Sequence, residues 1–232
     1  MFEQISADYA LIEPPGADTW CPTVEKEMWH RFRLMWALRH ALLELRRPLP
    51  EIRALDVGCG FGRSSAALVE FGVRPGNIVG IDLREWVIDE ARRRYPGIQF
   101  KAVTGLEWID ELGVFDFAMQ CTVFSSIRQP QERRRLAWAI ARVTRPGAVF
   151  LWWDRRRANK WAGGDELKPL SYFSDDCWTA VHWAELPTRP LLTEAVRPGA
   201  LTRRLARVLQ RWFGHPATHV VALFRRKDSQ AA

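Results

Sequence analysis

A glycine-rich turn between an apolar segment and a helical one is the most constraining feature of this sequence. Ala54 to Val57 is apolar apart from Asp56, and glycines follow at positions 58, 60 and 62. Glycine lets the backbone turn tightly and leaves no Cβ between chain and ligand, and a helix that starts there presents unpaired N–H groups. The pattern therefore indicates a nucleotide pocket. Its G-x-G-x-G spacing disfavours an NAD-dependent reductase, which would more usually show G-x-G-x-x-G.

Four segments in order resemble the class I S-adenosylmethionine (SAM) methyltransferases. They are the glycine turn, Val79 to Leu83, Phe115 to Phe124, and Val143 to Asp154. The resemblance implies that family's α/β fold, a Rossmann-like, doubly wound sheet of seven strands, mostly parallel with the last strand reversed. It also implies SAM as the cofactor and S-adenosylhomocysteine as its product.

Hydrophobic periodicity predicts the elements of such a sheet. Strands are expected at 52–57, 77–82, 98–103, 115–120, 148–153, 179–186 and 218–225, and helices at 24–46, 62–71, 84–94, 130–144 and 201–212. Because strands and helices alternate, a parallel sheet is predicted. In the first helix, the residues that recur at helical intervals are Met28, Phe32, Met35, Trp36, Leu38, Leu42 and Leu45.

Size and composition fit one catalytic domain. At 232 residues and 47% hydrophobic, the chain can bury a sizeable core. We expect an N-terminal arm and helix over 1–50 that shapes the substrate site as a lid within the same domain. The SAM-dependent methyltransferase domain then covers 51–232. The polar loop at 155–165 is expected near the mouth of the site, and the long connection at 188–216 is expected to shape the substrate site.

Ligands of open α/β sheets bind beyond the carboxyl ends of the strands, so the cofactor-binding candidates lie at strand exits. The resemblance implies that Asp56 holds the methionine ammonium, directly or through water, and that the glycines admit the cofactor. It implies that Asp82 grips both ribose hydroxyls, which a carboxylate can accept together, and that Leu83 lies on the adenine face. Alternatively, the acids cap helices and Thr104 forms a turn. The full set is Asp56, Gly58, Gly60, Gly62, Asp82, Leu83, Thr104, Gly105 and Gln120.

One departure from the family pattern concerns adenine. Many relatives carry an acid after the third strand, whereas this chain has Thr104-Gly105-Leu106-Glu107. A hydroxyl or a backbone carbonyl would have to serve in place of that acid.

Methyl transfer is a direct displacement, and positioning of the reactants with exclusion of water can supply most of its acceleration. A dedicated base is therefore not obligatory. A hydroxyl acceptor would still gain from a nearby base. The catalytic candidates are Asp154 and His182, with Glu185 as a further one. A covalent role for Cys121, as in cytosine C5 methylation, is disfavoured because the proline motif of those enzymes is absent; the alternative is a small buried thiol.

The segment Gln120 to Phe124 bears on the methyl acceptor. Relatives that methylate exocyclic amines of bases carry Asn/Asp-Pro-Pro-Tyr/Phe at that place, which this chain lacks. A bacterial subgroup associated with glycan and specialised-metabolite assembly is resembled by four segments together: Gln120 to Ile127, Arg155 to Gly164, Pro190 to Val196 and Thr218 to Arg226. We therefore expect transfer to an oxygen, or less readily a nitrogen, of a small molecule, sugar or specialised metabolite. The alternatives are an RNA methyltransferase, favoured by the net charge of +7, and a non-catalytic SAM-binding or scaffold subunit.

Cysteine usage and apolar runs exclude other classes. The four cysteines form no C-x-x-C pair, so no metal site and no disulfide framework is predicted. With no signal segment and no apolar run of about 20 residues, we expect a soluble cytoplasmic protein. Trp20 and Trp29, expected to be exposed, would line either an acceptor cavity or a homodimer contact.

Overall fold

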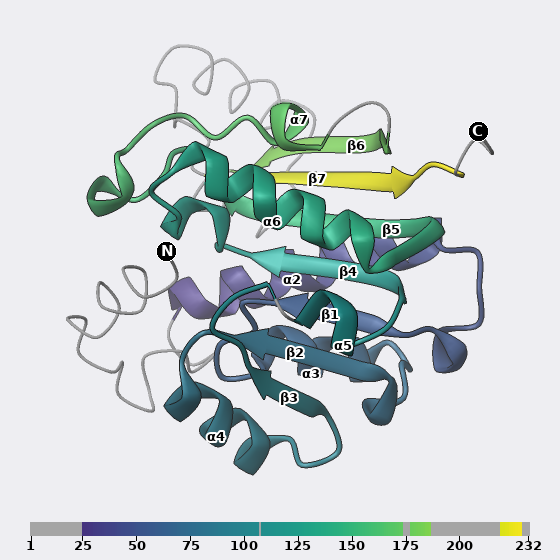
Figure 1. The fold of residues 1–232 in the computed structure, drawn as a ribbon. Coiled ribbons are helices and arrows are strands. Elements are labelled where there is room, and N and C mark those ends of the chain that lie inside the picture. The colour runs from purple at the N-terminus through teal and green to yellow at the C-terminus, as the bar shows by residue number, and fades with distance from the viewer. Residues whose placement is uncertain (1–24, 107, 174–176, 187–218, 229–232) are drawn as a thin grey trace, which may run out of the picture.

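A seven-stranded sheet forms the centre of the protein in the computed structural model, which describes residues 25–106, 108–173, 177–186 and 219–228 (Figure 1). The strand order is β3-β2-β1-β4-β5-β7-β6. The strands are β1 (Ala54–Val57), β2 (Ile78–Asp82), β3 (Gln99–Ala102), β4 (Phe115–Cys121), β5 (Thr144–Arg155), β6 (Trp178–Leu186) and β7 (His219–Arg226).

The central strands are parallel and buried on both faces. All of β1 and β2 is buried, and Ala54 pairs with Ile78 on one side and with Phe117 on the other. A strand covered on both faces needs a continuous apolar run, which β1 and β2 supply apart from one acid each. β7 runs antiparallel to both β5 and β6. These findings confirm the predicted Rossmann-like sheet with its reversed last strand.

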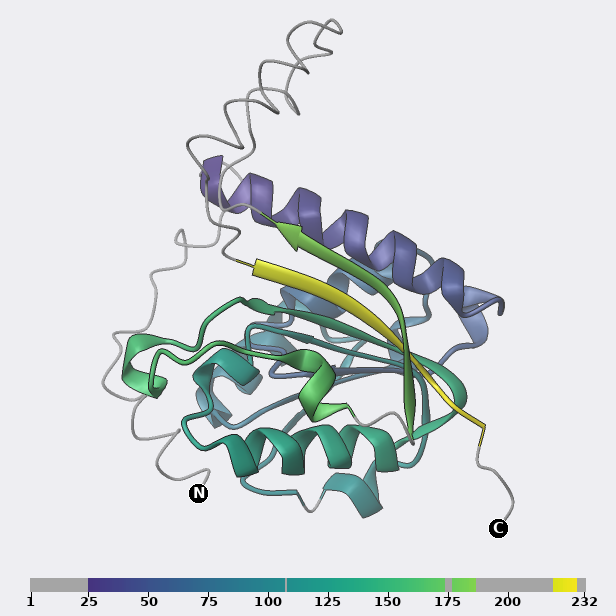
Figure 2. The ribbon, with the colours of Figure 1, turned by 90° about the horizontal axis from the view of Figure 1, so that it is seen from above.

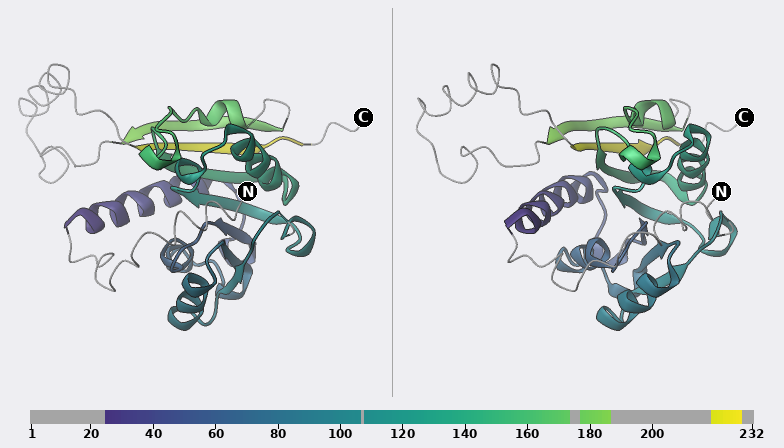
Figure 3. Two further views of the ribbon diagram at one scale, coloured as in Figure 1. Left: turned by 60° about the vertical axis from the view of Figure 1, so that its left-hand side comes forward. Right: turned by 90° about the vertical axis from the view of Figure 1, so that its left-hand side faces the viewer.

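Helices cover both faces of the sheet, as Figures 2 and 3 show. One face carries α2 (Glu25–Glu44), α3 (Arg63–Glu70) and α4 (Glu85–Arg94), and the other α5 (Trp108–Glu111), α6 (Pro130–Arg142) and α7 (Pro169–Tyr172). Short 3₁₀ turns join them: η1 (Leu49–Glu51), η2 (Pro75–Asn77), η3 (Phe124–Ser126) and η4 (Lys160–Ala162). Each layer buries its own apolar core against the sheet, as a doubly wound fold requires.

Helix α2 buries a different stripe from the one that its sequence periodicity suggested. Leu38, Leu42 and Leu45 pack against the sheet as expected, together with Leu34, Ala37 and Ala41. Met28, Phe32 and Trp36, which recur at the same helical intervals, are instead exposed. The helix therefore carries two apolar stripes, and alanines complete the buried one. Sequence periodicity cannot show which of two apolar stripes faces the sheet.

Several expectations fall on residues outside the described ranges. These are the helix at 201–212, the whole connection at 188–216, and Trp20. Trp29 is described and is half-buried, not exposed, with its ring 6.1 Å from that of Phe32. Among the described residues, no helix is both long enough and apolar enough to cross a lipid bilayer.

Candidate functional site

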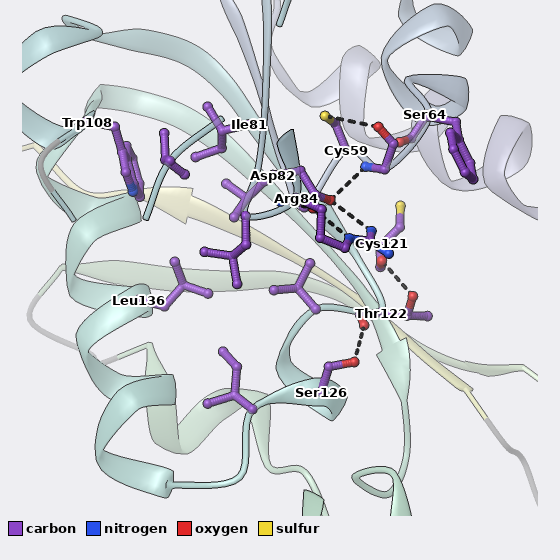
Figure 4. Close-up of a pocket in the computed structure, with 18 of the residues that line it drawn as sticks. Cys59, Ser64, Ile81, Asp82, Arg84, Trp108, Cys121, Thr122, Ser126 and Leu136 are labelled. Atoms are coloured by element: carbon purple, nitrogen blue, oxygen red, sulfur yellow. Dashed lines mark hydrogen bonds and ion pairs between the residues drawn. The ribbon is translucent and has the colours of Figure 1, made fainter. Parts of the chain in front are cut away.

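A cavity of about 350 Å³ opens at the carboxyl ends of the central strands. Pockets of this size are typical of small-molecule sites. Figure 4 shows Asp82 and Arg84 near its middle, with Trp108 and Leu136 on one side and Cys121 and Thr122 on the other. The wall is formed by Val57, Gly58, Cys59, Gly60, Phe61, Arg63, Ser64, Ile81, Asp82, Leu83, Arg84, Val103, Gly105, Trp108, Cys121, Thr122, Val123, Ser126, Ile127 and Leu136.

The glycine turn forms one wall of this cavity, and its glycines serve different needs. Gly58, Gly60 and Gly62 all have positive φ, at 69°, 53° and 78°. A Cβ on Gly60 would meet no atom within 4 Å, whereas one on Gly58 would lie 2.3 Å from Cγ2 of Val123. Gly60 thus leaves cavity space open. Gly58 permits close packing of the turn against the exit of β4.

Gly62 lies outside the cavity wall. A Cβ there would lie 2.6 Å from the ring of Phe100 and 3.0 Å from that of Tyr95. This glycine therefore allows helix α3 to approach its neighbours and acts on packing rather than at the cavity.

Asp82, at the end of β2, faces the cavity and accepts four hydrogen bonds. Oδ2 accepts from the Gly60 backbone N–H at 3.0 Å and from Arg84 Nη2 at 3.2 Å. Oδ1 accepts from the Arg84 backbone N–H at 3.1 Å and from Arg84 Nε at 2.9 Å. The carboxylate therefore ties the glycine turn to β2 and stands where a ligand hydroxyl can reach it.

Asp56, in contrast, is fully buried and does not line the cavity. Its Oδ2 accepts from the hydroxyls of Ser64 and Ser65, each at 2.6 Å, and its Oδ1 is buried without a partner. Burial raises the pKa of this carboxyl from 3.8 to about 6, although the two serine hydroxyls oppose the rise. Ser64 itself lines the cavity, so Asp56 reaches that wall through a serine.

Gln120 supports the turn that follows β4. The side chain is fully buried, and its Oε1 accepts from the Val123 backbone N–H at 2.9 Å. Gln120 is absent from the cavity wall, whereas Val123 belongs to it. We predicted that Gln120 contacts the cofactor; in this structure its side chain contacts the turn after β4 instead.

The other side of the cavity is apolar. Trp108 from α5 and Leu136 from α6 line it together with Val103 and Leu83, and Gly105 is also part of the wall. Thr104 is exposed and is not part of the wall. A polar end beside the glycine turn and an apolar end under α5 and α6 suit a ligand with one ionic and one aromatic part.

The two predicted catalytic residues lie away from the cavity wall. Asp154 is fully buried and accepts from the backbone N–H groups of Arg155 at 2.7 Å and Ser125 at 3.2 Å. Burial raises its pKa to about 6. His182 lies on β6, three strands from β4, where its ring stacks on that of His40 at 5.9 Å. The structure therefore brings neither side chain to the cavity, and Glu185 lies on the same distant strand.

Two cysteines line the cavity with protonated thiols. Burial raises the pKa of both Cys59 and Cys121 well above 9.0, and the Asp56 carboxylate adds to the effect. A thiol of this kind is a poor nucleophile. Among the described residues, no group of three or more histidine, cysteine, aspartate or glutamate side chains is arranged to hold a metal ion.

Sequence reasoning missed several wall residues. Arg84 lies two residues after a predicted site acid, and Thr122 and Ser126 follow the exit of β4, so their positions at strand ends were a usable signal. Trp108 and Leu136 carried no such signal. They reach the cavity because α5 and α6 pack over the sheet, which depends on tertiary structure.

Comparison with known proteins agrees with this geometry. Residues 54–147 match the family described as a methyltransferase domain. An O-methyltransferase of Pyrenophora dematioidea is 30% identical over 46% of this chain and 40% of its own length. The ubiquinone biosynthesis O-methyltransferase of Rhizobium rhizogenes is 26% identical over 58% of this chain and 57% of its own length. The chain thus spans about half the length of the curated relatives it matches.

Solved structures share the whole fold. The N-methyltransferase NodS from Bradyrhizobium japonicum, crystallised with S-adenosylhomocysteine, superposes with a TM-score of 0.65 at 16% identity and covers 97% of both chains. At this identity the likeness establishes the fold. Together with the match over 54–147, it shows that the chain carries a methyltransferase domain with the fold of the class I SAM-dependent methyltransferases.

Proposed function

We propose that the chain binds SAM in the cavity and transfers its methyl group to an oxygen, or less readily a nitrogen, of a small molecule, sugar or specialised metabolite. The observation that carries this proposal is the carboxylate of Asp82 beside the open space at Gly60. A carboxylate accepts two hydroxyl donors at once, and the missing Cβ leaves room for a ligand chain.

Different wall residues would contact different parts of the cofactor. Asp82 would hold the ribose hydroxyls, and Leu83 with Gly105 and Trp108 would enclose the adenine ring. The turn at Gly58 and Gly60 would receive the amino-acid tail, with the Ser64 hydroxyl, itself held by Asp56, on the same side. When bound, the cofactor supplies an electrophilic methyl group. A lone pair of the acceptor atom would form the new bond to the methyl carbon, and sulfur would keep the electron pair of the broken C–S bond.

The residues of this chain would contribute positioning and water exclusion. No ionised base from the described residues lies on the wall apart from Asp82, which we assign to the ribose. An acceptor held in line, away from water, gains most of its acceleration from orientation. Asp154 and His182 remain candidate bases only if the protein rearranges on binding.

The acceptor class rests on the relatives. Two curated relatives are named O-methyltransferases, and the superposed NodS is an N-methyltransferase. Oxygen and nitrogen acceptors are therefore both supported, with oxygen favoured. The RNA alternative is weakened because many arginines are paired with acids, such as Arg93 with Glu90 and Arg156 with Glu166.

Calorimetric titration tests the cofactor. Titrating the protein with S-adenosylhomocysteine and, separately, with NAD should show binding of the former alone. Asp82→Ala should abolish most of that affinity, because it removes the ribose acceptor. Binding of NAD, or unchanged S-adenosylhomocysteine affinity in the variant, would contradict the assignment.

A further inference from the structure

Thr122 has a backbone conformation that threonine rarely adopts. Its φ is 62°, in the left-handed region, and Arg46 is the one other non-glycine residue with positive φ in the described ranges. For a β-branched side chain this conformation is a true outlier, because the Cβ substituents crowd the backbone. Such outliers persist where surrounding structure enforces them, often at ligand sites.

The bonds that the Thr122 backbone makes do not require a side chain. Its N–H donates to the Trp153 carbonyl at 2.8 Å, and its carbonyl accepts from the hydroxyls of Ser125 at 3.3 Å and Ser126 at 3.4 Å. Glycine would make the same bonds and would adopt this φ without steric cost. The backbone hydrogen bonds therefore account for the conformation of the turn, but not for a threonine at this position.

The Thr122 hydroxyl is oriented by a bond of its own. Oγ1 donates its hydrogen to the Cys121 carbonyl at 2.7 Å, and the exposed side chain lines the cavity. A hydroxyl has one hydrogen and two lone pairs. In this arrangement the hydrogen is donated within the protein, so the lone pairs of Oγ1, on a residue of the cavity wall, can serve as hydrogen-bond acceptors.

We propose that Thr122 contacts the methyl acceptor and takes a hydrogen bond from its O–H or N–H group. This inference rests on the proposed function and narrows its substrate class to alcohols, phenols and amines. A carboxylate or thiolate acceptor carries no hydrogen to donate and would face oxygen lone pairs. Thr122 thereby selects ether or amine products over methyl esters and thioethers.

Three substitutions separate the hydroxyl from the backbone strain. T122V removes the hydroxyl and keeps the volume and β-branch, T122S keeps the hydroxyl, and T122G removes both side chain and strain. Thr179, exposed on β6 outside the cavity, provides the matched control T179V. Each protein is measured for S-adenosylhomocysteine affinity, thermal midpoint, and the rate of labelled methyl transfer from SAM into a cell extract, with the labelled product identified by mass spectrometry.

We expect the wild type, T122S and T179V to label the same ether or amine product at similar rates. T122V should transfer about fivefold to tenfold more slowly, the loss expected for one neutral hydrogen bond. T122G should transfer equally slowly while its thermal midpoint rises by about 2–4 °C as strain is relieved. S-adenosylhomocysteine affinity should stay unchanged throughout.

The outcomes separate this inference from the proposed function. Wild-type rates in T122V, or a methyl ester or thioether as product, would overturn the role of Thr122 and leave the methyltransferase assignment intact. A wild-type protein that does not bind S-adenosylhomocysteine, or that binds it and labels nothing, would overturn the proposed function itself.

Discussion

Arg84 forms a two-point ion pair with Asp82 and completes the set of donors around that carboxylate. Nε and Nη2 of Arg84 lie 2.9 Å and 3.2 Å from the two carboxylate oxygens, whose other partners are backbone N–H groups of Gly60 and Arg84. A carboxylate offers about four lone-pair sites, so none remains for a ribose diol. The backbone donors are fixed, and the guanidinium is therefore the group that must yield when a nucleoside binds.

Arg84→Met should raise S-adenosylhomocysteine affinity by about threefold to fivefold. The Arg84 side chain is 23% exposed and that of Asp82 is 6% exposed; a net contribution of roughly 1 kcal/mol, the upper end for exposed pairs, sets the size of the gain. Asp82→Asn should lower the affinity by about tenfold or more, because it removes one acceptor oxygen. Isothermal calorimetry at fixed salt measures both.

Arg93→Met is the control for that experiment, because Arg93 pairs with Glu90 on the exposed side of α4. Its S-adenosylhomocysteine affinity should equal that of the wild type. Weaker binding in Arg84→Met would show instead that the guanidinium holds the ligand.

Asp56 makes stability depend on pH. Desolvation raises its folded-state pKa from 3.8 to about 6, against the hydrogen bonds from Ser64 and Ser65. The folded state thus binds the proton more tightly than the unfolded state. The associated stabilisation, about 3 kcal/mol, is complete below pH 3.8 and is lost as the pH rises to about 6. Asp56→Asn should remove this loss, because the amide oxygen can still accept both serine hydroxyls.

Urea unfolding at intervals between pH 4 and pH 8 checks this sign. The stability of Asp56→Asn relative to the wild type should increase from pH 4 to about pH 6 and then level off. Asp89→Asn, an exposed change on α4, should show no such trend. A constant difference between Asp56→Asn and wild type across the range would refute the linkage.

Gly58 and Gly60 differ in what a methyl group would meet. Both Gly58→Ala and Gly60→Ala incur the cost of positive φ, about 1–2 kcal/mol. Gly58→Ala should lose roughly 1–3 kcal/mol more, because its Cβ would overlap Val123. Val123→Ala should restore part of the stability of Gly58→Ala and none of that of Gly60→Ala. Thermal unfolding of each glycine variant with and without Val123→Ala measures this. Equal effects of Val123→Ala on both glycine variants would refute the prediction.

Gly60→Ala should instead act on the ligand. Its methyl group would project into space that is open in the ligand-free protein and that we assign to the cofactor tail. S-adenosylhomocysteine affinity should fall by about tenfold or more in a variant that remains folded. Normal affinity would place the ligand elsewhere in the cavity.

The strand exits and the glycine turn could be predicted from sequence, because apolar runs and glycines mark them directly. Gly58, Gly60, Asp82, Leu83 and Gly105 all lie on the cavity wall. Which side chain at an exit faces the cavity was harder to predict. Side chains alternate between the two faces of a strand, and chain direction changes within a residue of its end. Asp56 and Gln120 consequently point into the protein interior, where they accept hydrogen bonds from the wall residues Ser64 and Val123.

The catalytic candidates failed to reach the cavity for a related reason. Sequence places Asp154 at a strand end but cannot show that the N–H groups of Ser125 and Arg155 enclose it. His182 was chosen for its chemistry, and its strand lies at the edge of the sheet. Position in the sheet order decides access to the site, and sequence spacing does not reveal that order.

Arg133 joins the loop after β5 to the cavity wall from a fully buried position on α6. Its Nε donates to the carbonyl of Ile127, a wall residue, and its two terminal nitrogens donate to Asp165 at 2.5 Å and 3.1 Å. The Arg133 side chain is 0% exposed, whereas that of Asp165 is 45% exposed. The guanidinium lowers the pKa of Asp165, in keeping with a charged pair.

This difference in exposure predicts that removing Asp165 and removing Arg133 lower the stability of the protein by different amounts. Asp165→Ala leaves a buried guanidinium without its carboxylate and should lower the free energy of unfolding by about 2–3 kcal/mol. Arg133→Met leaves Asp165 near water and fills the buried space with apolar atoms, so its loss should be smaller, about 1 kcal/mol. Glu166→Ala, which removes an exposed pair with Arg156, should change stability by less than about 0.5 kcal/mol. Urea unfolding ranks the three variants, and an Arg133→Met loss larger than that of Asp165→Ala would mean that packing of the arginine stem, rather than its charge, holds the loop to the wall.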